Sequence, residues 1–133
     1  MSTVSDLPTL IRTMSPSAGP EVYVFLSIGS GEPIPDGMVP IMLFREAEGL
    51  TLIVPRDQAE AAGQTGSFPS RMITLTVASA LESVGFLAAI TARLAEAGIP
   101  VNPVSAFHHD HLFVPEARSD EAMASLRAMY DEG

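Results

Sequence analysis

The side chains best suited to chemistry lie in one short stretch, residues 108–111, which has the sequence His-His-Asp-His. Imidazole and carboxylate groups together suit zinc, iron or nickel. On an extended strand, neighbouring side chains point to opposite faces, so only His109 and His111 converge easily. The chain has no other histidine to complete three ligands. We therefore favour a polar hairpin turn, or a turn that places Asp110 in a binding site, over a metal centre.

Two catalytic alternatives also start from these residues and their neighbours. Ser79 or Ser83 could combine with a histidine and Asp110 in a hydrolase triad, but the chain has no Gly-x-Ser-x-Gly elbow. The glycines of residues 29–31 have neither a third glycine nor a following helix, so they do not form a dinucleotide fingerprint. We expect no catalytic residue, no metal and no cofactor.

Isolated charged residues could contact a ligand or simply be solvated. Arg45, Glu46 and Glu48 fall at a predicted hairpin, where exposed ion pairs contribute little, and we favour a solvated turn. Glu82 precedes a predicted helix, and a carboxylate there stabilises the helix without any ligand. Both interpretations stay open for Glu82.

The composition excludes several classes of function. Hydrophobic residues make up 47% of the 133-residue chain, which is enough for a folded core. The net charge of -9, with seven basic residues, argues against binding nucleic acid or anionic membranes. The absence of cysteine excludes disulfides and thiol catalysis. No apolar run reaches the roughly 18 residues of a membrane span, and residues 1–6 do not resemble a signal peptide, so we expect a cytoplasmic protein.

The first half of the sequence predicts a helix, three strands and a second helix. Ser5 or Asp6 can cap the first helix, which a Ser/Pro/Gly segment at residues 15–20 should break. Gly49 has the freedom to turn the hairpin between the second and third strands. The predicted strands are residues 22–28, 39–45 and 50–54, and the second helix is residues 56–62, ended by Gly63.

The second half predicts a strand, a helix, a hairpin and a final helix. Ile73, Leu75 and Val77 alternate with threonines, as expected for a half-buried strand. Val84, Leu87, Ile90 and Leu94 form an apolar stripe at helical spacing, and Gly98 follows it as the C-terminal cap. The hairpin strands are residues 101–107 and 111–114, and the final helix starts at Ser119 and packs through Ala122, Leu126 and Met129.

Short antiparallel strands with helices on one face predict an α+β fold with two halves, residues 1–66 and 67–133. Each half is marginal alone at this size, so the two should share a continuous sheet or a packed interface. The strand edges that remain favour a homodimer.

The second half resembles an ACT domain, a ferredoxin-like βαββαβ domain. The resemblance rests on the strand at residues 72–77, the loop at residues 81–85, the helix end at residues 94–99 and the Gly-Ile-Pro-Val-Asn stretch at residues 98–102. The Asp-x-Pro-Gly of the family is Glu-Ser-Val-Gly here, which keeps the carboxylate and glycine but not the proline. The family's fourth strand is absent after the last helix, so the first half or a partner chain should supply it.

The stretches at residues 44–52, 73–77 and 107–114 resemble a bacterial family of stand-alone tandem ACT proteins, and paired ACT domains also form eukaryotic arginine sensors. The resemblance implies an amino-acid site at the interface of ACT halves or of two subunits. A helix start would hold the carboxylate, and Asp110 is similar in placement to an aspartate that holds the other end. The implied ligand residues are Glu82, Ser83, Val84, Gly85, Asn102 and Asp110.

Three hypotheses for function follow. The first is a non-enzymatic sensor that binds a small molecule, expected to be an amino acid. The second is an adaptor that docks another protein through an apolar sheet edge. The third, which we favour least, is a small enzyme that uses residues 108–111.

Overall fold

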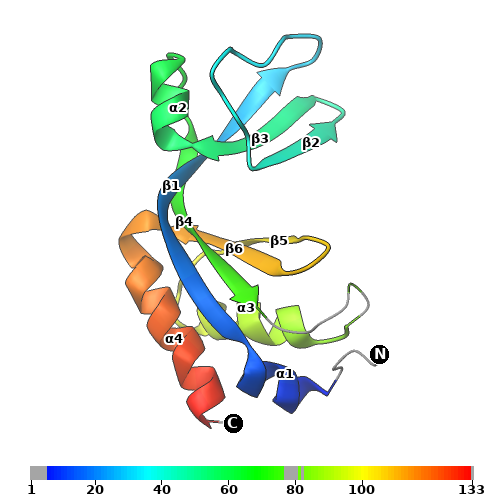
Figure 1. The fold of residues 1–133 in the computed structure, drawn as a ribbon, viewed down its shortest axis with the longest axis vertical. Helices are drawn as coiled ribbons and strands as arrows, with labels where there is room; N and C mark the ends of the chain where they lie inside the picture. Colours follow the sequence, from blue (N-terminus) through cyan, green and yellow to red (C-terminus); the bar gives the residue numbers. More distant parts are fainter. Residues whose placement is uncertain (1–5, 77–80, 82, 133) are drawn as a thin grey trace. The chain divides into compact units, whose positions relative to one another are not determined.

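The computed structural model describes residues 6–76, 81 and 83–132 and has an α+β fold, as predicted (Figure 1). Antiparallel strands form a six-stranded sheet with helices packed against it. Among the described residues, no helix is long and apolar enough to cross a membrane. In chain order the elements are α1 (Leu7–Thr13), β1 (Ser15–Gly29), β2 (Met42–Glu46), β3 (Gly49–Pro55), α2 (Arg56–Ala61), β4 (Ser67–Thr76), α3 (Phe86–Glu96), β5 (Asn102–Ser105), β6 (Asp110–Pro115), the 3₁₀ turn η1 (Glu116–Arg118) and α4 (Ser119–Glu132).

Two compact units divide the chain. One is continuous in sequence, Glu21–Ser70, and we call it the continuous unit. The other, the split unit, combines Met1–Pro20 with Arg71–Gly133. The boundaries fall inside β1 and β4, so each of these long strands contributes residues to both units.

The continuous unit is a small sheet with a helix and a loop on one face. β3 pairs with both β1 and β2, and α2 contacts β3 (Figure 1). Gly49 starts β3 with a φ of 143°, so the predicted glycine turn of the hairpin is confirmed. Apolar side chains from β1, β3, α2 and the loop form its core: Val24, Leu26, Ile28, Met38, Leu52, Val54 and Ala59.

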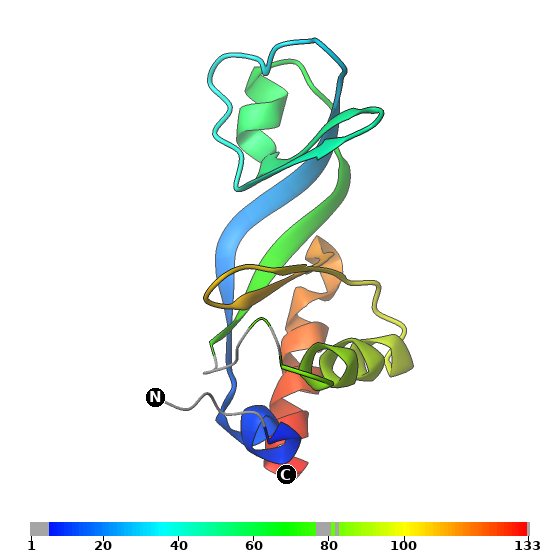
Figure 2. The ribbon, with the colours of Figure 1, turned by 90° about the vertical axis from the view of Figure 1, so that its right-hand side faces the viewer.

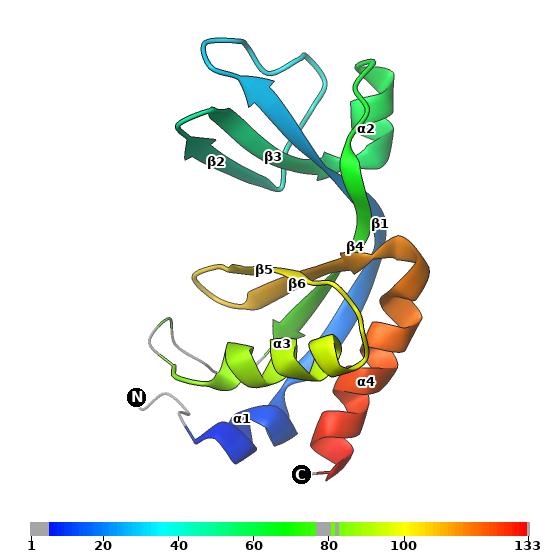
Figure 3. The ribbon, with the colours of Figure 1, turned by 180° about the vertical axis from the view of Figure 1, so that it is seen from behind.

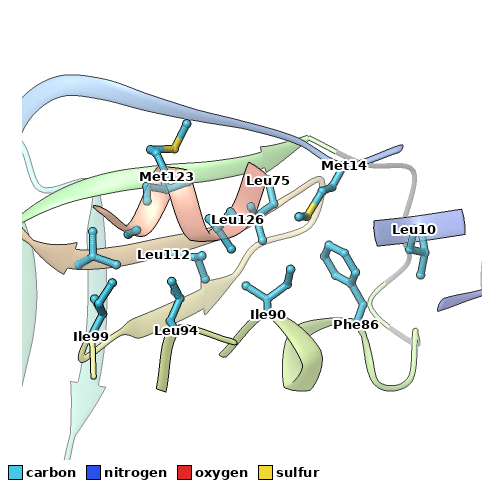
Figure 4. Packing of buried hydrophobic residues seen from close by; sticks show 13 residues of the cluster. Leu10, Met14, Leu75, Phe86, Ile90, Leu94, Ile99, Leu112, Met123 and Leu126 are labelled. Carbon is cyan, nitrogen blue, oxygen red and sulfur yellow. The ribbon is translucent and has the colours of Figure 1, made fainter. Parts of the chain in front are cut away.

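The split unit packs three helices against its strands. α1, α3 and α4 contact one another in pairs (Figure 3). Asp6 caps α1 by accepting a hydrogen bond from the Thr9 N–H at 3.1 Å, as predicted. Figure 4 shows the core that these helices and β4 and β6 enclose. Its buried members are Leu10, Met14, Ile73, Leu75, Phe86, Ile90, Leu94, Ile99, Leu112, Val114, Ala122, Met123 and Leu126.

The end of α3 is closed by the glycine motif that the sequence predicts. Gly98 has a φ of 74° and its N–H bonds to the Ala95 carbonyl at 2.9 Å. The Ile99 N–H bonds to the Leu94 carbonyl at 2.9 Å, and both side chains are buried in the core. This pair of hydrogen bonds defines a Schellman cap. Arg118 reinforces the cap by donating to the Gly98 carbonyl at 2.7 Å and the Ala97 carbonyl at 3.1 Å.

The strand order shows which strand takes the place of the fourth strand that the second half lacks. The sheet runs β2-β3-β1-β4-β6-β5, and Figure 2 shows β1 and β4 side by side. A ferredoxin-like domain, with strands numbered along the chain, has the order 4-1-3-2. Counted from β4 toward β2, the sheet has this order with β4 as the fourth strand. Counted from β1 toward β5, it has the order again, now with β1 as the fourth strand. Each ferredoxin-like half therefore borrows its last strand from the other, as the sequence led us to expect for the second half.

Two local predictions were wrong. The segment at residues 15–20 follows the end of α1, as predicted, but β1 already begins at Ser15 and not at residue 22. This turn-like segment is extended because it lies beside β4, where the Arg71 Nε donates to the Gly19 carbonyl at 2.7 Å. Tertiary pairing overrides local preference here. Val84 was expected on the apolar stripe of α3, but it precedes the helix and is 85% exposed.

Candidate functional site

A pocket of about 220 Å³ lies within the split unit, between the start of α3 and the turn that joins β5 to β6. Leu81 and Ser83 from the loop before α3 form one wall together with Leu87 on the helix. The turn forms the other wall with Ser105, Ala106, Phe107, His108, His109 and Asp110. A volume of this order suits a metabolite of about the size of an amino acid.

The start of α3 places backbone N–H groups beside this pocket. Gly85 is the N-cap residue with a φ of 90°, and no side chain among the described residues caps the helix. The first N–H groups of any α-helix have no intrahelical acceptor, because the hydrogen bonds run back four residues. Here the first such bond joins the Ala89 N–H to the Gly85 carbonyl at 2.9 Å. The donors before it, together with the helix dipole, favour a negative group at this end.

The turn between β5 and β6 leaves a buried histidine nitrogen without a partner. The Ala106 N–H bonds to the His109 carbonyl at 3.0 Å, which closes the turn. The His109 Nδ1 is buried and has no hydrogen-bond partner among the described residues. Buried polar atoms in native proteins are nearly always paired. His109 is one of the residues that line the pocket, so this unpaired nitrogen belongs to the pocket wall.

Asp110 and His111 begin β6 and face opposite sides of the sheet. Asp110 shares its face with Leu112 and Val114, which point into the helix-covered core, so its half-buried carboxylate belongs to the pocket side. His111 faces the other side, where its Nδ1 lies 3.0 Å from Thr74 Oγ1. Burial lowers the pKa of His111, as does nearby His109, while Asp110 acts in the opposite direction.

The structure brings together only part of the site that the sequence predicts. Ser83 and Asp110 both line the pocket, and Gly85 sets the start of α3 beside it. Val84 is exposed and outside the lining. Asn102 is exposed and pairs with Phe113, at the opposite end of the hairpin from the Ser105–Asp110 pair. Glu82 lies outside the described residues.

Several residues that line the pocket were not predicted from the sequence, and the position of His109 in the pocket wall was not predicted either. Leu87 was placed on the apolar stripe of the helix, and Leu81 and Phe107 were not singled out, because apolar side chains carry no signal for a pocket. His109 was considered as a metal ligand or as the partner of a catalytic serine, and its ring centroid lies 6.4 Å from that of His111. Within the described residues, no group of three His, Asp or Glu side chains is placed to hold a metal ion.

The strand order is that of two paired ferredoxin-like domains, and a pocket lies beside the loop before α3 in one of them. Residues 2–71 match the ACT domain family, and residues 67–128 match a second profile of the same description. The chain belongs to the ACT-domain family. Because ACT domains are regulatory and commonly bind small molecules, membership supports a regulatory, ligand-binding role.

Solved structures agree with this assignment. A protein of unknown function from Vibrio cholerae, described as a possible transport protein, is 36% identical over 97% of this chain and 99% of its own, with a TM-score of 0.85. A protein from Agrobacterium tumefaciens is 18% identical over 88% of this chain and 89% of its own, with a TM-score of 0.71.

The regulatory subunit of aspartate kinase from Thermus thermophilus is 12% identical over 88% of this chain and 96% of its own, with a TM-score of 0.66. At that identity it shows the shared fold. No curated protein matches the chain.

Proposed function

We propose that the protein is a non-enzymatic sensor that binds an amino acid in the pocket of the split unit. The observation that carries this proposal is a pocket that holds Asp110 and borders the start of α3. A helix start attracts a carboxylate and Asp110 attracts an ammonium group. The two features together favour a zwitterion.

In the proposed complex, the first N–H groups of α3 and the hydroxyl of Ser83 bind the ligand carboxylate. Asp110 binds the ammonium group through charge-assisted hydrogen bonds. The ligand side chain packs against Leu81, Leu87 and Phe107, which makes an uncharged side chain the better fit. The contacts expected from Glu82, Val84 and Asn102 stay predictions.

A second copy of the chain completes the pocket in this proposal. Two of the lining residues are large apolar side chains left in solvent, since Leu81 is 65% and Phe107 77% exposed. Exposed apolar side chains beside a polar pocket are typical of interfaces. Ligand binding between subunits would then change their packing, which is how a sensor transmits its signal.

A thermal-shift screen against the twenty amino acids tests the sensor proposal. A ligand at one hundred times its Kd adds about 2.7 kcal/mol to the free energy of unfolding, which raises the Tm by several degrees. Asp110→Ala should abolish the shift. Asp131→Ala, which removes an exposed carboxylate on α4, should leave it unchanged. A shift that survives Asp110→Ala would reject the site. The absence of a shift with all twenty amino acids would reject an amino acid as the ligand.

A second candidate function, docking of another protein, has its own supporting observation. The chain before and within β2 exposes large apolar side chains, with Val39 at 71% and Phe44 at 62%. Because β2 is an edge strand, its backbone can also accept a further strand. This function becomes the better explanation if the amino-acid screen fails and the Phe44→Ser variant loses a specific protein partner.

A further inference from the structure

All three histidines of the chain lie in or beside one wall of the pocket of the split unit. His108 and His109 belong to the turn between β5 and β6, and His111 follows on β6. The ring centroid of His109 lies 6.3 Å from that of His108 and 6.4 Å from that of His111. Because histidine changes charge between about pH 5 and about pH 8, this wall gains positive charge as the solution becomes acidic.

His109 cannot gain a proton in its present position without leaving a buried donor unpaired. Its ring is half-buried, and the Nδ1 is buried with no hydrogen-bond partner among the described residues. In a neutral imidazole with its proton on Nε2, the Nδ1 is an unpaired acceptor. In the charged ring both nitrogens are donors, so the Nδ1 becomes a buried N–H without an acceptor. An unpaired donor of a charged group costs more free energy to bury than a neutral acceptor does.

The groups around His109 offer little compensation for a positive charge. Among the described residues that line the pocket, Asp110 is the one carboxylate. In the proposed complex this carboxylate binds the ammonium group of the ligand. The opposite wall, formed by the loop before α3 and by the helix itself, contributes three lining residues without charge, Leu81, Ser83 and Leu87.

His111 adds a second basic group next to His109. Burial lowers the pKa of His111 first, His109 lowers it further, and Asp110 raises it by less than His109 lowers it. On β4, the group that faces His111 is the uncharged hydroxyl of Thr74, whose Oγ1 lies 3.0 Å from the His111 Nδ1. A proton on one of these two rings therefore opposes a proton on the other, and Asp110 offsets this repulsion only in part.

The turn has few contacts that would hold it in place once the His109 ring moves. Its backbone is closed by the Ala106 N–H, which bonds to the His109 carbonyl at 3.0 Å. Residues 105–108 are exposed, and Phe107 keeps 77% of its surface in solvent. A segment with few buried contacts opens at a low cost in free energy. Movement of the His109 ring into water should therefore displace the turn, and with it one wall of the pocket.

We propose that the turn at residues 105–110 is a pH-sensitive wall, in which protonation of His109 moves the turn and weakens the binding of a ligand in the pocket. The movement of the turn is a property of the free protein. The loss of affinity rests on the proposed sensor function, because the added positive charge repels an ammonium group and competes with it for Asp110. The two parts of the proposal can therefore be tested separately.

Hydrogen exchange of the Ala106 amide, measured by NMR on the ligand-free full chain, tests the movement of the turn. Its protection factor, corrected for the pH dependence of exchange in an unfolded chain, should fall at least about tenfold between about pH 7.5 and about pH 5.5. One pH unit below the pKa of a free histidine changes the ratio of neutral to charged rings about tenfold. His109→Gln, which keeps a polar side chain that does not titrate, should remove the fall. His108→Gln, which removes an exposed histidine of the same turn, should leave it unchanged.

Two outcomes of the exchange experiment would overturn the proposal. One is a protection factor that stays constant over this pH range. The other is a fall that persists in His109→Gln, whether or not His111→Gln removes it, because the turn would then respond to another group.

Affinity measurements test the consequence for binding. The amino acid with the largest thermal shift is titrated by calorimetry at both pH values, and its affinity should be at least about tenfold lower at the acidic one. His109→Gln should bind it with similar affinity at both. Equal affinities in the wild type would overturn the effect on the ligand. If no amino acid binds, the sensor function and this effect are both rejected, whereas the exchange of the Ala106 amide still decides whether the turn responds to pH.

Discussion

At the scale of single residues, Asp110 and His111 are neighbours in the sequence, but their side chains lie on opposite faces of the sheet. Asp110 faces the helix side and the pocket, and His111 faces Thr74 on the other side of the sheet. Alternation along a strand is enough to predict this separation from the sequence. It is not enough to predict that the His109 Nδ1 is buried without a partner, because that depends on how the turn folds over the loop before α3.

His111 should make the stability of the protein depend on pH. Its pKa in the folded protein is lowered from 6.5, first by burial and then by His109, so the unfolded chain binds the proton more readily. The stabilisation is complete above about pH 6.5 and is lost as the pH falls through the lowered pKa of the folded state. Thermal melts from about pH 8 to about pH 5.5 should show a falling Tm, with a shallower fall in His111→Gln.

The carboxyl groups with shifted pKa values do not contribute to the change in Tm over this pH range. Hydrogen bonds from Thr9 and Arg118 lower the pKa values of Asp6 and Glu121 from 3.8 and 4.5, so these groups change charge at lower pH. Parallel pH profiles for the wild type and His111→Gln would contradict the assignment to His111.

At the scale of elements, the helix ends were predictable and the length of β1 was not. Asp6 caps the start of a helix, and Gly63 and Gly98 follow the ends of two others. The types of these residues predict such helix ends from local geometry alone. The first residues of β1 include two prolines and a glycine, which favour a turn in isolation. Only β4, more than fifty positions later in the sequence, makes them a strand. The absence of a helix between β1 and β2, by contrast, was predicted from the sequence.

Two glycines with positive φ should respond differently to alanine. Gly63, at a φ of 72°, has open space around the position of a Cβ, so Gly63→Ala should cost only the backbone penalty of about 1–2 kcal/mol. Gly49→Ala adds an overlap with the Ile28 carbonyl and should cost about 3 kcal/mol or more. Urea titrations give both values, and equal losses for the two variants would show that the hairpin turn relaxes freely.

At the scale of the whole molecule, the two ferredoxin-like halves are completed by exchange of strands. The split unit takes Leu10 and Met14 of its core from the start of the chain, and the continuous unit takes residues 67–70 from the second half of the sequence. A division of the sequence near residue 66 separates two ACT-like halves but cuts across both compact units.

Fragments 1–66 and 67–133 should therefore fail to fold separately. Each lacks a strand, and the second also loses α1 and its core residues. Circular dichroism and proton NMR should show no cooperative unfolding for either fragment alone, and mixing the two should restore it. Cooperative unfolding of either fragment by itself would show that the borrowed strand is dispensable.

The discontinuity of the split unit also has a consequence for the protein during synthesis. Residues 7–14 leave the ribosome well before their core partners in α3 and α4, which come more than seventy positions later in the sequence. Glu21–Ser70, by contrast, is available as one uninterrupted segment much sooner. Until α3 and α4 have been synthesised, the apolar side chains of α1 lack these core partners, and such exposed segments are where nascent chains aggregate or recruit chaperones. An architecture in which two halves share one pair of strands thus delays completion of the split unit until α4 has been synthesised.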